Sequence, residues 1–257
     1  MALKCGIVGL PNVGKSTLFN CLSNAKAQAA NFPFCTVEPN VGVITVPDER
    51  LRQLSDLVRP EKLVPTTVEI VDIAGLVKGA SKGEGLGNQF LGNIRETDAI
   101  IHVVRCFTDD NVVHVDGSVD PVRDKEVIDA ELMLKDLETV EKRLSQEEKI
   151  AKSGDKDAIK VVDVVGKVKA SLESGKPARS VELDKKEKLI LDSMFLLTAK
   201  PILYVCNVDE ASAVSGNDYV EQLVEATKDE NAELLVIAAA IEAEIVLLDT
   251  AEDRQEF

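Results

Sequence analysis

Short apolar runs recur along the chain and alternate with stretches of helical periodicity. The run from Ile100 to Val104 is interrupted only by His102, which is typical of a strand buried on both faces of a parallel sheet. Six such segments are predicted to be strands: Lys4–Val8, Gly42–Val46, Thr67–Asp72, Ala99–Arg105, Pro201–Asn207 and Glu233–Ala238. Because helical segments separate them, we expect parallel crossovers and a doubly wound α/β sheet.

The segment between the fourth and fifth predicted strands has another period. Two apolar seams repeat there at heptad spacing: Met133, Leu137, Val140 and Leu144 in the first, and Val161, Val165, Val168 and Leu172 in the second. The polar stretch Ser145–Lys160 separates the seams, and Gly154 supplies a turn. This pattern predicts an antiparallel helical hairpin inserted at residues 121–199. Its charged flanks are either a solvated face or an arm that docks on a partner.

The chain of 257 residues is acidic, with 45 Asp and Glu against 30 Lys and Arg and a formal charge of −15. An evenly acidic surface repels nucleic acid backbones, so we expect no sequence-specific DNA binding; a local basic patch or a protein partner stays open. No apolar stretch approaches the ~18 residues of a membrane span, and we expect no membrane partner and a cytoplasmic location. The five cysteines are scattered without a Cys-x-x-Cys pair, which argues against disulfides and zinc.

The residues after the first predicted strand carry a phosphate-binding motif. Gly9–Ser16 has the complete Gly-x-x-x-x-Gly-Lys-Ser pattern between a strand and a helix, where backbone N–H groups and a helix N-terminus face a phosphate. Lys15 supplies a positive charge for the β- and γ-phosphates, which also makes it a candidate catalytic residue. The predicted nucleotide contacts of this loop are Asn12, Val13, Gly14, Lys15, Ser16 and Thr17.

Two further segments are predicted to complete a Mg²⁺ site. Its expected ligands are the Ser16 hydroxyl, Asp72 at the end of the third strand, and Thr36 in a proline-punctuated loop. The backbone N–H of Gly75 is expected to sense the γ-phosphate, and the glycine-rich residues 79–87 fit a mobile switch. These features predict a Ras-like P-loop NTPase fold. Residues 1–120 and 200–257 would form its mostly parallel sheet, with the helical hairpin inserted between them.

The motif after the fifth predicted strand differs from that of guanine-binding P-loop proteins. Those proteins have Asn-Lys-x-Asp, in which the aspartate accepts two hydrogen bonds from guanine. The corresponding motif here is Asn207-Val208-Asp209-Glu210, which has valine in place of the lysine and glutamate in place of the aspartate. A carboxylate at the guanine-binding distance would repel the N1 lone pair of adenine, and the longer glutamate moves the carboxylate away from that position. Asn207, Val208 and Glu210 are therefore predicted to contact the base of ATP, with GTP bound more weakly. Alternatively, Asn207 only turns the strand into a loop.

Taken together, these segments resemble the YchF family of Obg-like ATPases, a branch of the translation-associated P-loop proteins. The resemblance extends over essentially the whole chain and rests on Gly9–Thr17, Asn31–Pro39, Asp72–Gly75 with Gly79–Leu91, His114–Gly117, Asn207–Glu210 and Glu242–Ile245. It implies a slow, Mg²⁺-dependent ATPase that associates with the ribosome. It also implies a small C-terminal TGS domain, which we expect to be missing because the sequence stops at Phe257.

Two catalytic features and two other classes of function stay open. Leu76 stands where many switch GTPases have a water-orienting glutamine, and His114 is the predicted substitute unless it is packed for structural reasons. Asn12 either helps to hold K⁺ beside the phosphates or is a turn residue. The alternatives to an ATPase switch are an Obg-type GTPase that reads guanine through Glu210, and a nucleotide-sensing binding module with incidental hydrolysis.

Overall fold

The computed structural model describes residues 2–24, 41–73, 86–230, 232–248, 250 and 253–254. Its strands are β1 (Leu3–Val8), β2 (Val41–Thr45), β3 (Thr67–Asp72), β4 (Ala99–Arg105), β5 (Ile202–Asn207) and β6 (Glu233–Ile237). Its α-helices are α1 (Lys15–Asn24), α3 (Glu49–Val58), α4 (Leu86–Arg95), α5 (Pro121–Ala151), α6 (Lys156–Glu173), α7 (Lys185–Asp192), α8 (Asp218–Thr227) and α9 (Ala239–Ile245). Each predicted strand corresponds to one of the six in the structure.

The strands form one sheet in the order β2-β3-β1-β4-β5-β6. Among the described strands β2 alone runs antiparallel to its neighbour, so the predicted mostly parallel sheet is confirmed. Five predicted strand ends shift by one residue: β1 begins one residue earlier, β2 both begins and ends one residue earlier, β5 begins one residue later, and β6 ends one residue earlier. Pro201 has no N–H to donate and precedes β5, while Ala238 follows β6 as the N-terminal cap of α9.

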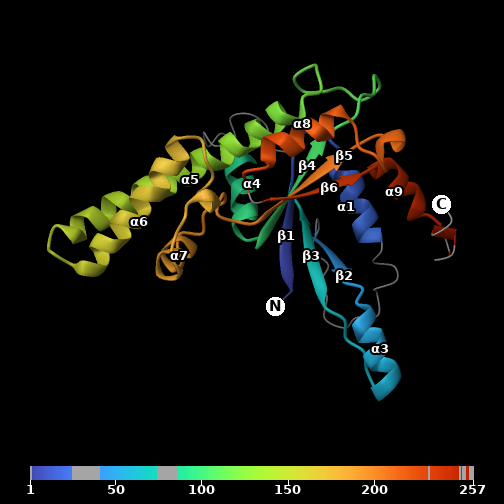
Figure 1. The fold of residues 1–257 in the computed structure, drawn as a ribbon, viewed down its shortest axis with the longest axis horizontal. Helices are drawn as coiled ribbons and strands as arrows, with labels where there is room; N and C mark the ends of the chain where they lie inside the picture. The colour runs from blue at the N-terminus through green and yellow to red at the C-terminus, as the bar shows by residue number, and fades with distance from the viewer. Residues whose placement is uncertain are drawn as a thin grey trace.

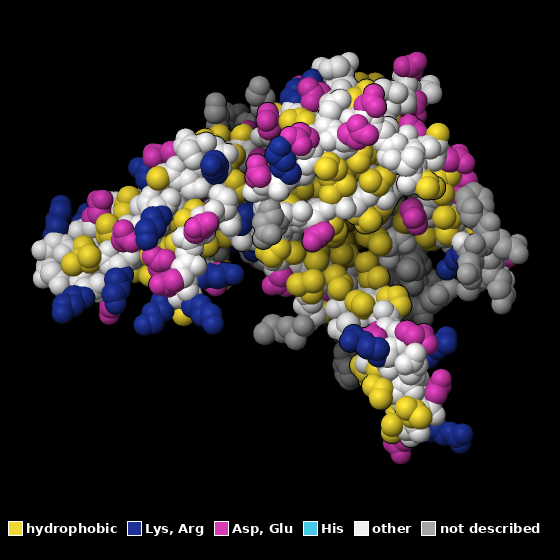
Figure 2. Space-filling model, in the orientation of Figure 1, with side chains coloured by type: hydrophobic (Ala, Val, Ile, Leu, Met, Phe, Trp, Pro, Cys, Tyr) yellow, Lys and Arg dark blue, Asp and Glu magenta, His cyan; other side chains and the backbone are white. Residues whose placement is uncertain are grey.

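Helices cover both faces of this sheet (Figure 1). Connections between parallel strands are right-handed, which places α4, α5 and α8 on one face and α1 on the other. The contacts agree, because α5 packs on α8 and β4, while α1 packs on α9, β2 and β3. Aliphatic side chains such as Ile7, Ile100 and Leu223 are buried at these interfaces. Figure 2 shows apolar side chains gathered over the body of the molecule and charged ones along its arm.

The arm is the predicted hairpin, formed between β4 and β5 by α5 and α6 (Figure 1). The two helices pack side by side along their heptad seams, where Val140 and Val165 are completely buried. Asp120 and Asp155 cap the helix N-termini by accepting backbone N–H groups, and Gly154 turns the chain at a left-handed φ of +87°. Although α5 has 31 residues, no helix in the described part of the chain is apolar and long enough to cross a bilayer.

A further layer, which the heptad pattern did not predict, completes the arm. α7 and the 3₁₀ turn η2 (Ala178–Ser180) fold back on the hairpin and add Leu191 and Ala178 to its apolar core. α7 begins at a capping box, in which the Asp184 carboxylate accepts the N–H of Glu187 and the Glu187 carboxylate accepts the N–H of Asp184. Capping fixes the start of this short helix, which has little propensity to form alone.

Buried charges join the arm to the sheet. The Lys125 ammonium at the start of α5 lies 2.5 Å from the Glu230 carboxylate, which also accepts hydrogen bonds from the Tyr204 hydroxyl at 2.7 Å and from Arg179 at 3.1 Å. These residues come from α5, β5, η2 and the turn after α8. Three donors from different elements converge on this partly buried carboxylate, so its position helps to fix the arm relative to the sheet.

We expect Asp136→Ala to lower the free energy of unfolding by about 3 kcal/mol. The buried Asp136 carboxylate accepts the backbone N–H groups of Leu197 and Thr198 at 2.8 and 2.7 Å, and the Thr198 hydroxyl at 2.7 Å, so its loss leaves buried donors without acceptors. Urea unfolding followed by circular dichroism measures this. The matched control, Asp163→Ala, removes an exposed partner of Lys167 and should cost under about 1 kcal/mol. Equal effects of the two substitutions would contradict the expectation.

Candidate nucleotide site

The loop between β1 and α1 curls tightly at two glycines. A Cβ on Gly9, whose φ is +151°, would lie 2.4 Å from the carbonyl oxygen of Val103. A Cβ on Gly14, whose φ is +97°, would lie 2.3 Å from Nδ2 of Asn207. α1 begins at Lys15 directly after this curl, so its N-terminus faces the loop. The strand, loop and helix therefore have the order and backbone conformation that phosphate binding requires.

Lys15 is a buried cation without an acidic hydrogen-bond partner among the described residues. It is 7% exposed, and its ammonium donates to the carbonyl oxygen of Leu10 at 2.6 Å. Burial lowers the pKa of Lys15 to about 8, while the nearby charge of Asp72 acts in the opposite direction. A desolvated ammonium held in this way is suited to an anion, because a phosphate would restore the lost charge stabilisation.

The residues predicted to hold Mg²⁺ lie on neighbouring elements. Asp72 ends β3 opposite Ile7 of β1, which brings its carboxylate beside the loop. Burial raises the pKa of Asp72, and the charge of Lys15 lowers it. Ser16 and the adjacent Thr17 are exposed in the first turn of α1, so the Ser16 hydroxyl is accessible to a metal ion. These oxygen donors fit Mg²⁺; the other two predicted residues, Thr36 and Gly75, lie outside the described residues.

Asn207 connects the phosphate loop to the base side of the site. From the end of β5 it donates through Nδ2 to the carbonyl oxygen of Val13 at 3.0 Å, and its Oδ1 accepts the N–H of Ala239 at 3.0 Å. Val208 is only 4% exposed and packs in the main core, so little of its side chain is left for a nucleotide base. Glu210 is exposed at the start of the 3₁₀ turn η3 (Glu210–Ser212). In this motif the Asn207 amide is thus structural, Val208 belongs to the core, and the Glu210 carboxylate is exposed.

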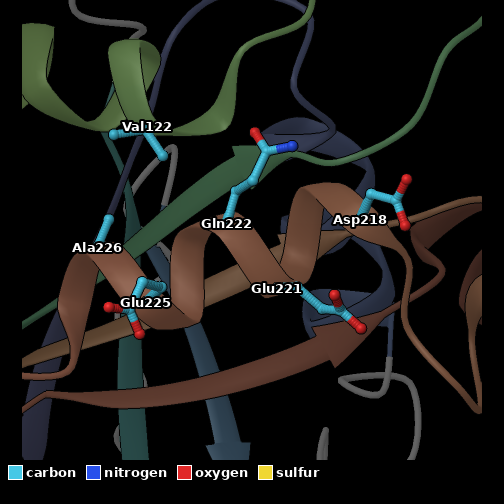
Figure 3. Close-up of a pocket in the computed structure, with 6 residues that line it drawn as sticks. All are labelled: Val122, Asp218, Glu221, Gln222, Glu225 and Ala226. Carbon is cyan, nitrogen blue, oxygen red and sulfur yellow. The ribbon is translucent and has the colours of Figure 1, made fainter.

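A separate hollow of about 630 Å³ lies between α8 and the start of α5 (Figure 3). Its lining includes the carboxylates of Asp218, Glu221 and Glu225. Three acids with no basic residue among its lining side chains repel phosphates. The nucleotide site is therefore assigned to the loop before α1 and not to this hollow.

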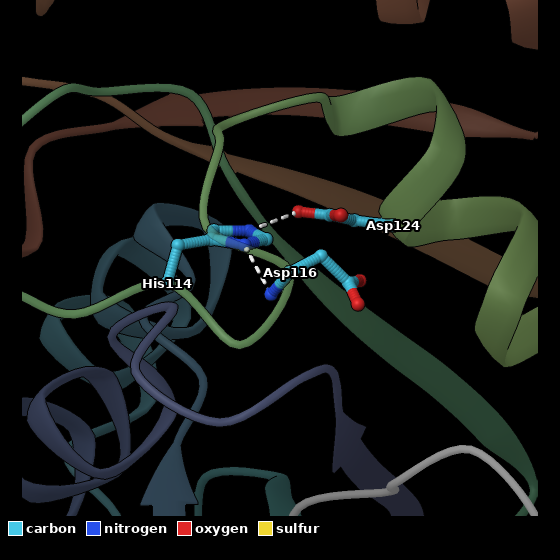
Figure 4. Close-up of side chains that lie close together, drawn as sticks. All are labelled: His114, Asp116 and Asp124. Atoms are coloured by element: carbon cyan, nitrogen blue, oxygen red, sulfur yellow. Dashed lines mark hydrogen bonds and ion pairs between the residues drawn. The ribbon is translucent and has the colours of Figure 1, made fainter.

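Both nitrogens of His114 are bonded within the protein (Figure 4). Nε2 lies 2.7 Å from Oδ2 of Asp124. Nδ1 lies 3.1 Å from the backbone nitrogen of Asp116 and accepts a hydrogen bond from it, because a backbone N–H can only donate. The ring proton is therefore on Nε2 and is donated to Asp124. With a side chain only 6% exposed, His114 has the environment of a packed histidine. To orient a water molecule it would have to exchange one of these partners.

His114, Asp116 and Asp124 also lie close enough together to ligate a cation, with ligand atoms within 4.8 Å of one another. Arg123 already supplies positive charge there. Its Nη2 lies 3.0 Å from the carboxylate of Asp124, and its Nε lies 3.9 Å from that of Asp116. The Arg123 guanidinium therefore neutralises the negative charge of this cluster, and the cluster stabilises the start of α5.

Two contacts in this region were not anticipated from the sequence. The Asn12 side chain donates to the carbonyl oxygen of Val113 at 3.0 Å, which ties the phosphate loop to the loop that carries His114. Arg105, 2% exposed, donates to the backbone oxygens of Phe107, Asp109 and Val112 and so shapes the same loop. The sequence offered one signal for the role of Arg105, which is a charged residue at the end of an apolar strand. It offered no signal for the contact between Asn12 and Val113.

Comparisons with known proteins agree with this geometry. Residues 4–143 match a family model described as 50S ribosome-binding GTPase. "Ribosome-binding ATPase YchF" of Bacillus subtilis is 56% identical over 100% of this chain and 70% of its own length, and that of Escherichia coli O157:H7 is 53% identical with the same coverage. The solved Schizosaccharomyces pombe structure titled YchF GTPase superposes with a TM-score of 0.86 at 38% identity, covering 99% of this chain and 70% of that one.

We expect nucleotide affinity to fall as the pH rises above about 8, by up to about tenfold per pH unit. Free Lys15, with a pKa of about 8, loses its proton there, whereas a bound phosphate raises that pKa, so binding takes up a proton. Titration with a fluorescent nucleotide across this range measures the slope. Lys15→Arg is the control, because a guanidinium stays protonated and should flatten the profile. A parent profile as flat as that of the variant would contradict the assignment.

Proposed function

This chain belongs to the YchF family of P-loop NTPases, and we propose that it is a switch that binds and slowly hydrolyses ATP with Mg²⁺, acting with the ribosome in the cytoplasm. The observation that carries the choice of ATP is the motif Asn207–Glu210. Its exposed acid is one methylene longer than the guanine-reading aspartate, and its lysine is replaced by the buried Val208. The bacterial relatives are named ribosome-binding ATPases, which supports the same choice.

The alternative that a specific observation favours is a GTPase. The matching family model and the solved S. pombe relative are both described as GTPases. In this alternative, Glu210 still reaches the N–H groups of guanine despite its longer side chain. The two functions differ in one measurable quantity, which is the ratio of the affinities for ATP and GTP.

Each residue of the phosphate side has a role in this proposal. Lys15 and the backbone N–H groups of residues 12–17 hold the β- and γ-phosphates, and Gly75 senses the γ-phosphate. Ser16, Asp72 and Thr36 would hold Mg²⁺, which when bound neutralises charge on the phosphate oxygens. K⁺ beside Asn12 would add positive charge near the transferred phosphate. Because Nδ2 of Asn12 donates to Val113, only its Oδ1 is left for that ion.

The attacking water needs a group that orients it. Leu76, at the usual glutamine position, has no hydrogen-bonding side chain and lies outside the described residues. His114 is the candidate, and its present partners Asp124 and Asp116 hold it in one tautomer. Breaking the bond to Asp116 would free Nδ1 as an acceptor for a water proton. Intrinsic hydrolysis would then be slow because the reactive orientation competes with these two bonds.

The parent protein should bind ATP more tightly than GTP, and Glu210→Asp with Val208→Lys should recover guanine affinity. A restored bidentate contact is worth about 1–3 kcal/mol, which changes the preference by about one to two decades. Competition titrations with the two nucleotides measure it. Glu210→Asp alone shows how much of the change comes without disturbing the buried position 208. Glu221→Asp on α8 is a control that should leave the ratio unchanged. Tighter binding of GTP than ATP by the parent would establish the alternative function.

His114→Ala should leave ATP affinity unchanged and slow single-turnover hydrolysis at least tenfold, or about 1.4 kcal/mol of barrier. The physical reason is loss of the only imidazole in the loop that Asn12 ties to the phosphate loop. Val113→Ala is a matched control, because it keeps the backbone carbonyl that Asn12 binds. A variant that hydrolyses ATP at the parental rate would assign His114 a purely structural role.

A further inference from the structure

Both oxygens of the Asp124 carboxylate are engaged in hydrogen bonds. Oδ2 lies 2.7 Å from Nε2 of His114, and Oδ1 accepts hydrogen bonds from Nε and Nη2 of Arg123 at 3.3 and 3.0 Å. The guanidinium of Arg123 is itself held, because it donates to the hydroxyl and to the carbonyl oxygen of Ser118 at 3.1 and 2.6 Å. With a side chain only 3% exposed, Asp124 therefore presents one oxygen in one direction to the histidine ring.

The backbone of Asp124 is fixed by the start of α5. Asp120 is the N-cap of this helix, Pro121 is its first residue, and the N–H of Asp124 donates to the carbonyl oxygen of Asp120 at 3.0 Å. A helix N-terminus also favours a negative side chain in its first turn. Asp124 is thus a supported negative charge on a rigid element.

The other partner of His114 belongs to a more accessible segment. The N–H of Asp116 donates to Nδ1 at 3.1 Å from only two residues further along the same loop. The side chains of Val113 and Val115 in this loop are 74% and 55% exposed. Gly117 follows with a left-handed φ of +75°, and a Cβ placed on it would meet no described atom within 4 Å. Water competes more readily for an exposed hydrogen bond than for an enclosed one, so the bond to Asp116 is the weaker of the two.

The two bonds specify the same tautomer of His114, but only one of them can persist if the ring orients a water molecule. A carboxylate only accepts and a backbone N–H only donates, so both bonds place the ring proton on Nε2. Nδ1 can accept a hydrogen bond from water only after the N–H of Asp116 has left it. The bond to Asp124 alone then decides where the ring proton lies. Without it, the ring could adopt the other tautomer, in which Nδ1 carries the proton and cannot accept.

We infer that Asp124 is a positioning residue for ATP hydrolysis. Its carboxylate keeps the ring proton of His114 on Nε2, and so keeps Nδ1 as the acceptor that orients the attacking water. Arg123 assists by holding Oδ1, which leaves Oδ2 facing the ring. In this role Asp124 touches neither ATP nor the water. The inference rests on the proposed role of His114 and deepens it, because it names the group that makes the histidine competent.

The first test compares two neutralising substitutions at the start of α5. Asp124→Asn removes the charge with little change of shape, and its amide can donate to Nε2 and so favour a proton on Nδ1. This variant should slow single-turnover hydrolysis of ATP at least about tenfold and change the ATP affinity by less than about threefold. Asp120→Asn is the matched control, because it removes a negative charge from the cap of the same helix and asparagine caps as well as aspartate does.

The control should hydrolyse ATP within about twofold of the parental rate. A parental rate in Asp124→Asn, or an equal loss of rate in Asp120→Asn, would overturn the inference. Circular dichroism of both variants shows that the helix is retained.

A double variant separates positioning from a purely structural role. If Asp124 acts through the histidine ring, Asp124→Asn should slow hydrolysis no further in a chain that already has His114→Ala, because residues that act as a unit have non-additive effects. A further loss of about tenfold in the double variant would assign Asp124 to the stability of α5 alone and refute the inference.

The single variants also distinguish this inference from the proposal on which it rests. If His114→Ala hydrolyses ATP at the parental rate, the proposed role of His114 is wrong and the inference falls with it. If His114→Ala is slow and Asp124→Asn is not, the inference alone is wrong.

Nitrogen NMR of the histidine rings reads the tautomer directly and needs no turnover. The chain contains two histidines, His102 and His114, so the spectrum of His114→Ala assigns both. The probe is Mg²⁺ and ADP with aluminium fluoride, which stand in for ATP at the point of water attack, at about pH 8, where imidazole is ordinarily neutral. The parent should keep His114 in the Nε2–H form with and without the probe, whereas Asp124→Asn with the probe should show the Nδ1–H form. A parent in the Nδ1–H form, or an unchanged tautomer in Asp124→Asn, would contradict the inference.

Discussion

The nucleotide site depends on one buried amide, that of Asn207. Its two hydrogen bonds join the end of β5 to the phosphate loop at Val13 and to the start of α9 at Ala239. Gly14 packs so closely on the amide nitrogen that no side chain fits between them. An amide is needed because one partner accepts a hydrogen bond and the other donates one; a carboxylate would repel the carbonyl oxygen of Val13. The departures from the guanine motif fall at positions 208 and 210, where neither side chain is needed for this junction.

The parts of the fold predicted from the sequence are those set by local pattern. Continuous apolar runs identified the strands, and the phosphate loop was recognisable because its glycines and lysine are adjacent in sequence. The heptad seams identified the hairpin but not the layer of α7, since Leu191 and Ala178 have no shared period with the seams. The bond between His114 and Asp124 was also missed, because it depends on how the loop after β4 returns to the first turn of α5.

The arm is held rigidly at its root, which gives its outer charges a defined direction. Glu230 gathers donors from Lys125, Tyr204 and Arg179, three residues on different elements. Removing any one of them would leave a partly buried carboxylate short of a donor, so the group resists piecemeal rearrangement. Rotation of the arm relative to the sheet would have to break several such bonds at once.

The same root is connected to the phosphate loop through a short series of contacts. Asn12 of the phosphate loop binds Val113, the neighbouring His114 binds Asp124, and Asp124 lies in the first turn of α5. Any displacement of the phosphate loop would therefore act on the chain segment that enters the arm. The contact at Asn12 is exposed and single, whereas the pair at Asp124 is buried and braced by Arg123. The exposed contact is the weaker one, because water competes for its hydrogen bond. The arm would therefore follow a movement of the phosphate loop only if the bond between Asn12 and Val113 holds.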